Sequence, residues 1–298
     1  MTMKAGEFIT IDARPYRTFE SYHIYYPDLN VVDWINTYEI RVLGNLQRIN
    51  STRSGQALMK ALRNPITIVP LASPLQKTTT ATSANSTDSV KAGVLIRDCI
   101  DGHPLGDEEY GTGEGAASTI YFTPGSWTKG DAVFTMPTGP AGATPDEALF
   151  HELVHAVRNG QGQSDCRPVR DDYHTMEDFF AILLSNIYSS ETNRPLRENH
   201  TNFSVMSDAV ASSFHARYEY EIDRVCKANS DLARRFAAVP SRFNPLREHY
   251  MRALGSALVD TASLFVKPGP PVQYSTGASV VLEVGPARVI KRRHLRRK

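Results

Sequence analysis

The most constraining feature of this 298-residue sequence is the stretch ATPDEALFHELVHAVRNGQG at positions 143–162. Thr144, Pro145 and Glu147 form a strong helix start, because threonine caps, proline suits the first turn and glutamate completes a capping box. Two glycines, Gly160 and the last residue of the stretch, supply the stop. The residues between recur at helical spacing, so the stretch predicts one amphipathic helix.

This helix carries the pattern His151-Glu152-Leu153-Val154-His155. Histidines four residues apart project side by side, so both imidazoles can reach one metal ion. Glu152 lies about 100° round the helix, near the open position of such an ion. Zinc lowers the pKa of a bound water toward about 7, and an adjacent carboxylate can take its proton. We expect one zinc ion per chain, with His151 and His155 as ligands and Glu152 as general base.

The alternative is a polar surface helix with two solvated histidines. A pattern of this kind arises by chance in roughly one such chain in a hundred. The pattern's place within a strongly capped, amphipathic helix favours the metal site over this alternative.

A catalytic zinc site needs a third protein ligand. The metzincin continuation places a glycine and a histidine three and six residues after His155, but Arg158 and Gln161 stand there. That class is therefore excluded, and the ligand is expected from a second helix.

The segment YHTMEDFFAILLSNIYSSE supplies that helix, with Thr175 as its cap. Glu177 shares an otherwise apolar stripe, and an inward acid needs a partner such as zinc. We expect Glu177 as the third ligand, with Asp178 as the alternative and His174 as a further choice. A first-turn acid that complements the helix dipole is the structural alternative for Glu177.

Elsewhere the pattern predicts strands first and helices later. Helices are expected over 30–49, 55–63, 145–159, 176–190, 206–228, 231–238 and 245–256, and strands over 66–71, 91–98, 118–124 and 132–137. Elements in this order predict an α+β fold, a zincin-like metallopeptidase with a small twisted sheet over the HExxH helix and a mostly helical C-terminal half.

The chain is expected to divide into an arm at 1–28 with one strand (FITID), a catalytic domain at 29–258, and a Pro/Gly-rich and basic tail at 259–298. The Ser/Thr-rich stretch 73–89 is expected to be an exposed loop. The run Gly111-x-Gly113-x-Gly115 precedes a strand instead of opening a helix, so we expect a mobile loop and no nucleotide site.

The tail 288–298 holds seven of the 33 basic residues, and without it 26 basic residues face 32 acidic ones. The remaining body is therefore mildly acidic, and nucleic-acid binding is expected at most through the tail. Three sparse cysteines fit free thiols in a reducing cytosol. No apolar run is long enough for a membrane span, and no secretory signal peptide is visible.

Three blocks, STIYFTPG, PDEALFHELVHAVRNGQG and YHTMEDFFAILLSNIYSSETNRPLRENH, resemble the NleD-like effector metallopeptidases of pathogenic and plant-associated bacteria. This resemblance implies a zincin fold and a zinc endopeptidase that acts as an effector or toxin on a protein of a host or target cell. It carries over His151, Glu152 and His155, and it matches the acidic pair Glu177-Asp178. It also implies synthesis in the cytoplasm and secretion or injection by a specialised secretion system.

Within this hypothesis the strand Ser118, Thr119, Ile120, Tyr121 and Phe122 is expected to be the sheet edge that pairs with an extended substrate. Tyr188, His200 and Arg197 are candidates to stabilise the oxyanion, and Arg158 is a candidate to orient a ligand. The protein substrate and the oligomeric state stay open. The competing function is a non-proteolytic, zinc-containing scaffold, although an intact Glu152 argues against a purely structural site.

Overall fold

The computed structural model describes residues 2–14, 31–70, 81–84, 91, 93–95, 112–124, 141–169, 173–200 and 203–265. The fold mixes α and β structure, with helix predominating, as the sequence predicted. The chain divides into two compact units, Met1–Gly255 and Ser256–Lys298. The first contains the sheet and all of the candidate site residues, while the basic tail and the expected strand 132–137 lie outside the described residues.

A five-stranded sheet has the order β1 (Thr2–Ala5), β2 (Ile9–Asp12), β3 (Ile66–Val69), β6 (Ser118–Tyr121) and β4 (Ala81–Ala84). The three central strands are parallel, and the two outer strands run antiparallel to their neighbours. Isoleucines of the central strands are buried because alternate side chains face the helices. The N-terminal segment, expected to be an arm, therefore contributes two strands to the sheet.

The strand β6 is not the edge that the sequence predicted. It pairs with β3 on one side and with β4 on the other, so the backbone from Ser118 to Tyr121 is occupied on both sides. Among the described strands, β4 ends the sheet on this side, and it comes from the Ser/Thr-rich stretch expected to be a loop. Its sequence, ATSA, lacks the apolar alternation by which a half-buried strand is recognised.

The helices are α2 (Val31–Asn50), α3 (Arg53–Met59), α5 (Pro145–Gly160), α6 (Met176–Glu191), α7 (Ala211–Arg217), α8 (Glu219–Ala228), α9 (Ser230–Ala237) and α10 (Pro245–Phe265). The helix expected over 206–228 is two helices, because Tyr218 leaves the helical conformation at φ −120° and ψ 32°. Its ring packs against Phe179 and Tyr173, so tertiary packing fixes the break. None of the helices within the described residues is both long and apolar enough to cross a bilayer.

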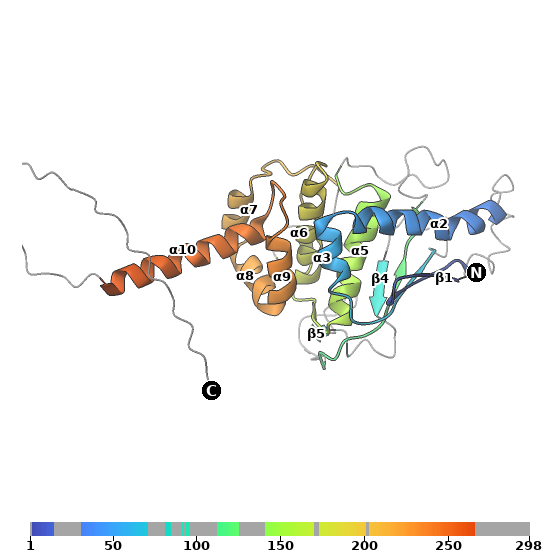
Figure 1. Cartoon of the computed structure of the whole chain (residues 1–298), viewed down its shortest axis with the longest axis horizontal. Helices are drawn as coiled ribbons and strands as arrows, with labels where there is room; N and C mark the ends of the chain where they lie inside the picture. Colours follow the sequence, from blue (N-terminus) through green and yellow to red (C-terminus); the bar gives the residue numbers. More distant parts are fainter. Residues whose placement is uncertain are drawn as a thin grey trace, which may run out of the picture. The chain divides into compact units, whose positions relative to one another are not determined.

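Helix α5 is the centre of the first unit (Figure 1). It lies between the sheet, where it contacts β4 and β6, and helix α6, with α2 and α3 alongside. A helix covered on several sides should be buried around most of its circumference. Only Pro145 and His155 of its 16 residues are not buried.

Within the glycine run, Gly113 and Gly115 pack against the end of α5 and the residues that follow it. A Cβ on Gly115, which has φ +89°, would lie 2.2 Å from the carbonyl oxygen of Gly160. A Cβ on Gly162, at φ +66°, would lie 2.3 Å from the carbonyl carbon of Gly113. These glycines allow two backbones to approach closely, which is a structural role.

A second sheet pairs β5 (Gly93–Leu95) with β7 (Ser164–Asp165) in parallel. Beside it, Cys166 is disulfide-bonded, whereas Cys226 is free and buried, and burial raises the pKa of its thiol to about 11. The expectation of free thiols is therefore wrong for Cys166. Spacing along the chain could not reveal this bond, because sheet pairing brings distant segments together.

Candidate metal centre

The two histidines of the motif lie inside the protein. His151 is 8% exposed and its neighbour Glu152 is 5% exposed, while the His155 side chain retains 15% of its surface. The helix has the predicted start, in which the carboxylate of Glu147 accepts a hydrogen bond from the backbone N–H of Thr144 at 3.2 Å. A surface helix with solvated histidines is therefore ruled out.

The imidazoles of His151 and His155 converge through equivalent nitrogens. Their Nε2 atoms are 3.0 Å apart and their ring centroids 4.7 Å apart. Two ligands of a tetrahedral zinc ion with bonds of about 2.05 Å stand about 3.3 Å apart. The pair therefore has nearly the separation that a shared zinc ion requires.

The pKa values of the two rings are shifted in opposite directions. Burial, reinforced by the charges of His155, His200 and Arg197, lowers the pKa of His151 well below its ordinary value. Burial also opposes the charged form of His155, but its hydrogen bond to Glu177 and the charge of Glu152 raise the pKa to about 9.

Glu177 lies on the far side of the His155 ring from His151. Its Oε1 is 3.4 Å from Nδ1 of His155, and its Oε2 accepts a hydrogen bond of 2.6 Å from Nε of Arg158. Oε2 also accepts from the backbone N–H of Asp165 at 3.2 Å. The inward acid has its partner, as expected, but the partner is Arg158. Glu177 therefore faces Nδ1 of His155 and not the Nε2 edge where the two histidines meet.

Arg158 is itself buried, at 2% exposure. Its guanidinium lies 4.2 Å over the ring of Phe180 and donates to the backbone carbonyl of Gln163. These contacts fix the guanidinium that holds Glu177, which in turn faces His155. Arg158 therefore holds the carboxylate that faces Nδ1 of His155.

Asp178 is the next residue on α6 and faces a different direction. Its backbone N–H donates to Oγ1 of Thr175 at 3.1 Å, and that hydroxyl donates to Oδ2 at 2.7 Å, so the predicted cap is present. Oδ1 lies 3.4 Å from Nε2 of His200. The charge of Asp178 also acts on His155 and Arg197, which places this carboxylate within the group of site residues.

Arg197 lies near two of the acids of the site, Asp178 and Glu152. Burial lowers its pKa to about 10, against the opposing charges of Asp178 and Glu152. The amide of Asn186 donates to the Arg197 carbonyl and accepts from its N–H, both at 2.8 Å. Asn186 therefore fixes the backbone from which the arginine reaches the site.

His200 joins the site from the segment that follows α6. Its ring stacks on that of His151 at 5.5 Å and meets that of His174 edge-to-face at 5.3 Å. Burial lowers the pKa of His200 to about 4, although Asp178 opposes this shift. The sequence suggested both residues singly, but no periodic signal indicated that they lie together.

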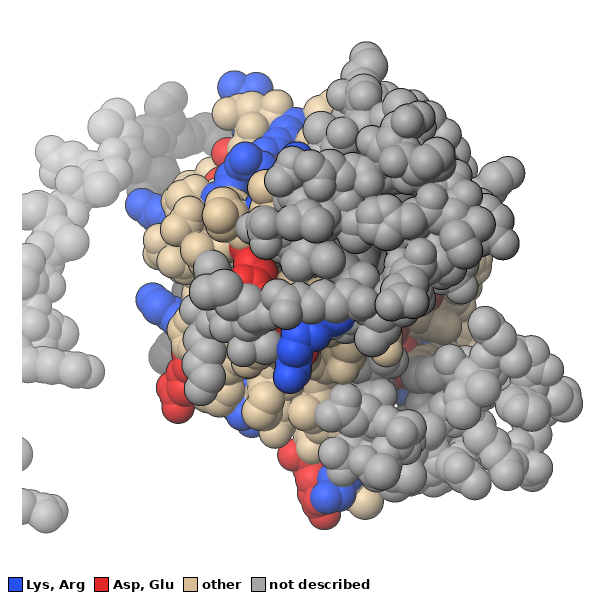
Figure 2. Space-filling view, turned by 90° about the vertical axis from the view of Figure 1, so that its right-hand side faces the viewer, with Lys and Arg blue, Asp and Glu red and all other residues tan. Residues whose placement is uncertain are grey.

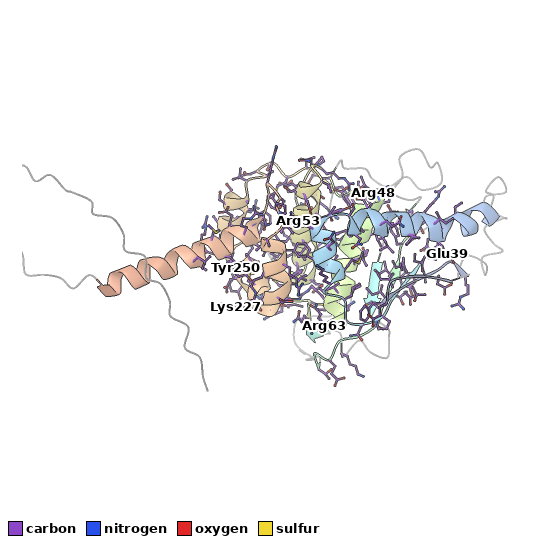
Figure 3. All side chains as sticks on the ribbon, viewed as in Figure 1. Glu39, Arg48, Arg53, Arg63, Lys227 and Tyr250 are labelled. Carbon is purple, nitrogen blue, oxygen red and sulfur yellow. The ribbon has the colours of Figure 1, made fainter. Side chains whose placement is uncertain are left out.

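Tyr188 does not belong to this site. Its hydroxyl donates to Oδ2 of Asp146 at 2.5 Å, and its ring stacks on Phe150 at 4.4 Å with no exposed surface. The same carboxylate binds Arg194 at 2.5 Å and Arg48, labelled in Figure 3, at 3.2 Å. The expected role in stabilising an oxyanion is therefore wrong for Tyr188, which joins α6 to the start of α5.

On the face drawn in Figure 2, basic and acidic side chains of the described residues are interspersed. Comparisons of the chain with models of protein families, with curated proteins and with solved structures found no match. Functional inference therefore depends on the geometry of the site.

Proposed function

We propose that this protein is a zinc-dependent endopeptidase of the zincin type, similar to the NleD-like effectors. One observation carries the proposal: two imidazole Nε2 atoms 3.0 Å apart on a buried helix that also carries Glu152. Two imidazole nitrogens at nearly the separation of two zinc ligands suit metal binding, and a buried carboxylate beside them suits general-base chemistry. The function of a zinc-containing scaffold requires no such carboxylate.

The proposed ligands are His151, His155 and Asp178. Asp178 replaces the expected Glu177 because Glu177 is bound to Arg158 and faces Nδ1 of His155. A carboxylate at Nδ1 fixes the tautomer that leaves Nε2 free to bind metal, and it raises the basicity of the ring. Glu177 and Arg158 are therefore positioning residues that orient His155.

The chemistry proposed is hydrolysis of a peptide bond. Zinc, when bound, lowers the pKa of water toward about 7 and polarises a carbonyl group. Glu152 takes the proton of the attacking water and delivers it to the departing amine. The guanidinium of Arg197 lies near Glu152 and Asp178, so it supplies positive charge where the oxyanion develops.

The substrate is proposed to be an extended polypeptide that pairs with β4, the last strand of the sheet on this side within the described residues. This strand ends the sheet on one side and contacts α5, the helix that carries the motif. An exposed edge offers unpaired backbone groups, so it binds extended chains through main-chain hydrogen bonds. In this proposal β4, and not the strand Ser118–Phe122, pairs with the substrate.

The effector role rests on the resemblance alone. We propose that the protein acts inside a host or target cell after delivery by a specialised secretion system. Fusion to a reporter that signals entry into a recipient cell tests this, with a strain that lacks the secretion system as control. Entry that is independent of the system contradicts the delivery proposal and leaves the enzymatic one intact.

The enzymatic proposal is tested by metal analysis together with an assay on an unfolded protein substrate. We expect zinc in the purified protein and cleavage that a chelator abolishes and zinc restores. His151→Ala should lose the catalytic zinc and the activity, whereas His249→Ala, a histidine on α10 beside His215, should keep both. Bound zinc with no cleavage of any unfolded protein would instead support the scaffold function.

A further inference from the structure

A second set of metal-binding side chains surrounds the start of α6. Within the described residues, His174, Asp178 and His200 each offer one ligand atom, and these atoms all lie within 4.8 Å of one another. Nε2 of His200 is 3.4 Å from Oδ1 of Asp178. That distance is close to the roughly 3.3 Å between two ligands of a tetrahedral zinc ion.

The backbone holds His174 in an uncommon conformation. Its φ is +63°, in the left-handed region that few residues other than glycine adopt. The flanking backbone fixes it there, since the His174 carbonyl accepts from Val169 N–H at 3.2 Å and Thr175 pairs with Pro168 in a β-bridge. Such backbone strain concentrates at functional sites, and here it accompanies an imidazole placed beside Asp178.

His200 presents Nε2 to Asp178, while its Nδ1 is buried and has no hydrogen-bond partner among the described residues. A neutral imidazole carries its proton on one ring nitrogen and offers the other as an acceptor or metal ligand. The nitrogen that faces Asp178 is therefore the one that the ring offers to an ion.

The available donors are too many for one catalytic zinc ion. Such an ion takes three protein ligands and keeps one open position. The site presents the pair His151 and His155 on α5 and the trio His174, Asp178 and His200 around the start of α6. The trio is compact by itself.

We propose that His174, Asp178 and His200 bind a second divalent cation beside the catalytic zinc, with Asp178 shared between the two. Two imidazoles and one carboxylate suit zinc or another first-row transition metal better than calcium or magnesium. This inference rests on the proposed function in one respect, because Asp178 is a ligand there too. The second ion binds more weakly, since the exposed side chain of His174 must become ordered.

Equilibrium dialysis of the full chain against zinc ions alone tests the proposal. Wild type should bind one equivalent tightly and a second at higher free zinc. His174→Asn should bind only the first, because asparagine tolerates the left-handed conformation but lacks the imidazole. The matched control, His249→Ala, removes a histidine of the separate pair with His215 and should keep two equivalents.

A wild type that stops at one equivalent overturns the proposal, as does His174→Asn that keeps two. Loss of the second equivalent in His249→Ala but not in His174→Asn also overturns it, by assigning that ion to the other pair. His200→Gln provides a second variant should His174→Asn not fold, and its circular dichroism is compared with wild type.

The outcome is separable from that of the proposed function. Two bound ions in a protein that cleaves nothing would overturn the peptidase proposal and leave the second site standing. Cleavage by a protein that binds one zinc at all concentrations would do the reverse. Cobalt substitution adds a spectroscopic readout, since two cobalt ions that share Asp178 should couple magnetically and attenuate the paramagnetic signal of the first.

Discussion

Helices α5 and α6 meet at two polar regions that differ in how their buried groups are partnered. At the start of α5, Asp146 binds Arg194, Arg48 and Tyr188, and Glu147 accepts from Ser189 at 2.6 Å. We call this the anchor region. One to two turns later, the imidazoles of the metal centre converge on one another, and Nδ1 atoms of two of them are buried without a hydrogen-bond partner among the described residues.

This difference in partners indicates that the anchor region stabilises the fold, whereas the metal centre serves metal binding and catalysis. A buried carboxylate surrounded by donors stabilises the fold, because breaking its contacts leaves uncompensated charge. Buried polar atoms that lack a hydrogen-bond partner destabilise the fold. Substitutions in the anchor region should therefore change the free energy of unfolding, whereas those in the metal centre should change metal binding and rate.

The largest effect is expected from Glu152→Gln in the metal centre. Removing a general base lowers kcat by roughly 10²- to 10⁴-fold. Because the zinc ligands stay intact, metal content should match wild type in elemental analysis. Wild-type turnover of an unfolded substrate by this variant would remove Glu152 from the mechanism. Glu147→Gln is the matched control, the same substitution in the anchor region of the same helix, and should keep wild-type kcat.

Asp146→Asn is expected to have the largest effect on stability. It removes the charge that faces Arg194 and Arg48, and breaking a buried ion pair costs about 3 kcal/mol or more. Urea unfolding followed by circular dichroism measures this loss. Zinc affinity of the folded variant should be unchanged, and a weakened affinity would show that the two regions are not separate.

Glu177→Gln is expected to act on metal affinity, since the glutamine no longer offers a charged partner to Nδ1 of His155. Loss of such a contact weakens zinc binding by roughly 10- to 100-fold without abolishing it. Competition with a chelator of known affinity measures the change. Asp178→Asn is the companion variant, and a smaller effect there than in Glu177→Gln would restore Glu177 as the ligand.

Tyr188→Phe removes one hydrogen bond from the anchor region and keeps the stacked ring. The loss of a buried hydrogen bond should lower the free energy of unfolding by about 1 kcal/mol. Thermal denaturation detects it, with activity at low temperature as the control. A clear loss of kcat in the folded variant would return Tyr188 to the candidates for oxyanion stabilisation.

The smallest expected effect is the pH dependence of the anchor region. Burial raises the pKa of Asp146, but hydrogen bonds from Tyr188 and Arg194 outweigh it and the pKa is lowered overall. Its contribution is thus fully present above the unfolded value of about 3.9 and is lost as pH falls through the lower folded value. The difference in stability between wild type and Asp146→Asn should stay constant from pH 7 to 5 and shrink at lower pH. A difference that grows on acidification would contradict the sign of the shift.

Much of the centre was predictable because its determinants are local. The helix α5, its capping residues and the side-by-side placement of His151 and His155 depend on contacts within one or two turns, which periodicity records. The cap at Thr175 and the helix that follows it were predicted on the same ground. The α+β class followed from the order of the elements.

The tertiary structure decided which groups face those histidines. Glu177 and Asp178 are adjacent, about 100° apart on their helix, and only the packing of α6 on α5 turned one toward Arg158 and the other toward His200. The same packing places the hydroxyl of Tyr188 where it donates to Asp146. Pairing between β4 and β6 puts β4, in place of β6, at the edge of the sheet. A sequence records the periodicity of each element, whereas the partner of a side chain depends on how distant elements cross, which no local pattern encodes.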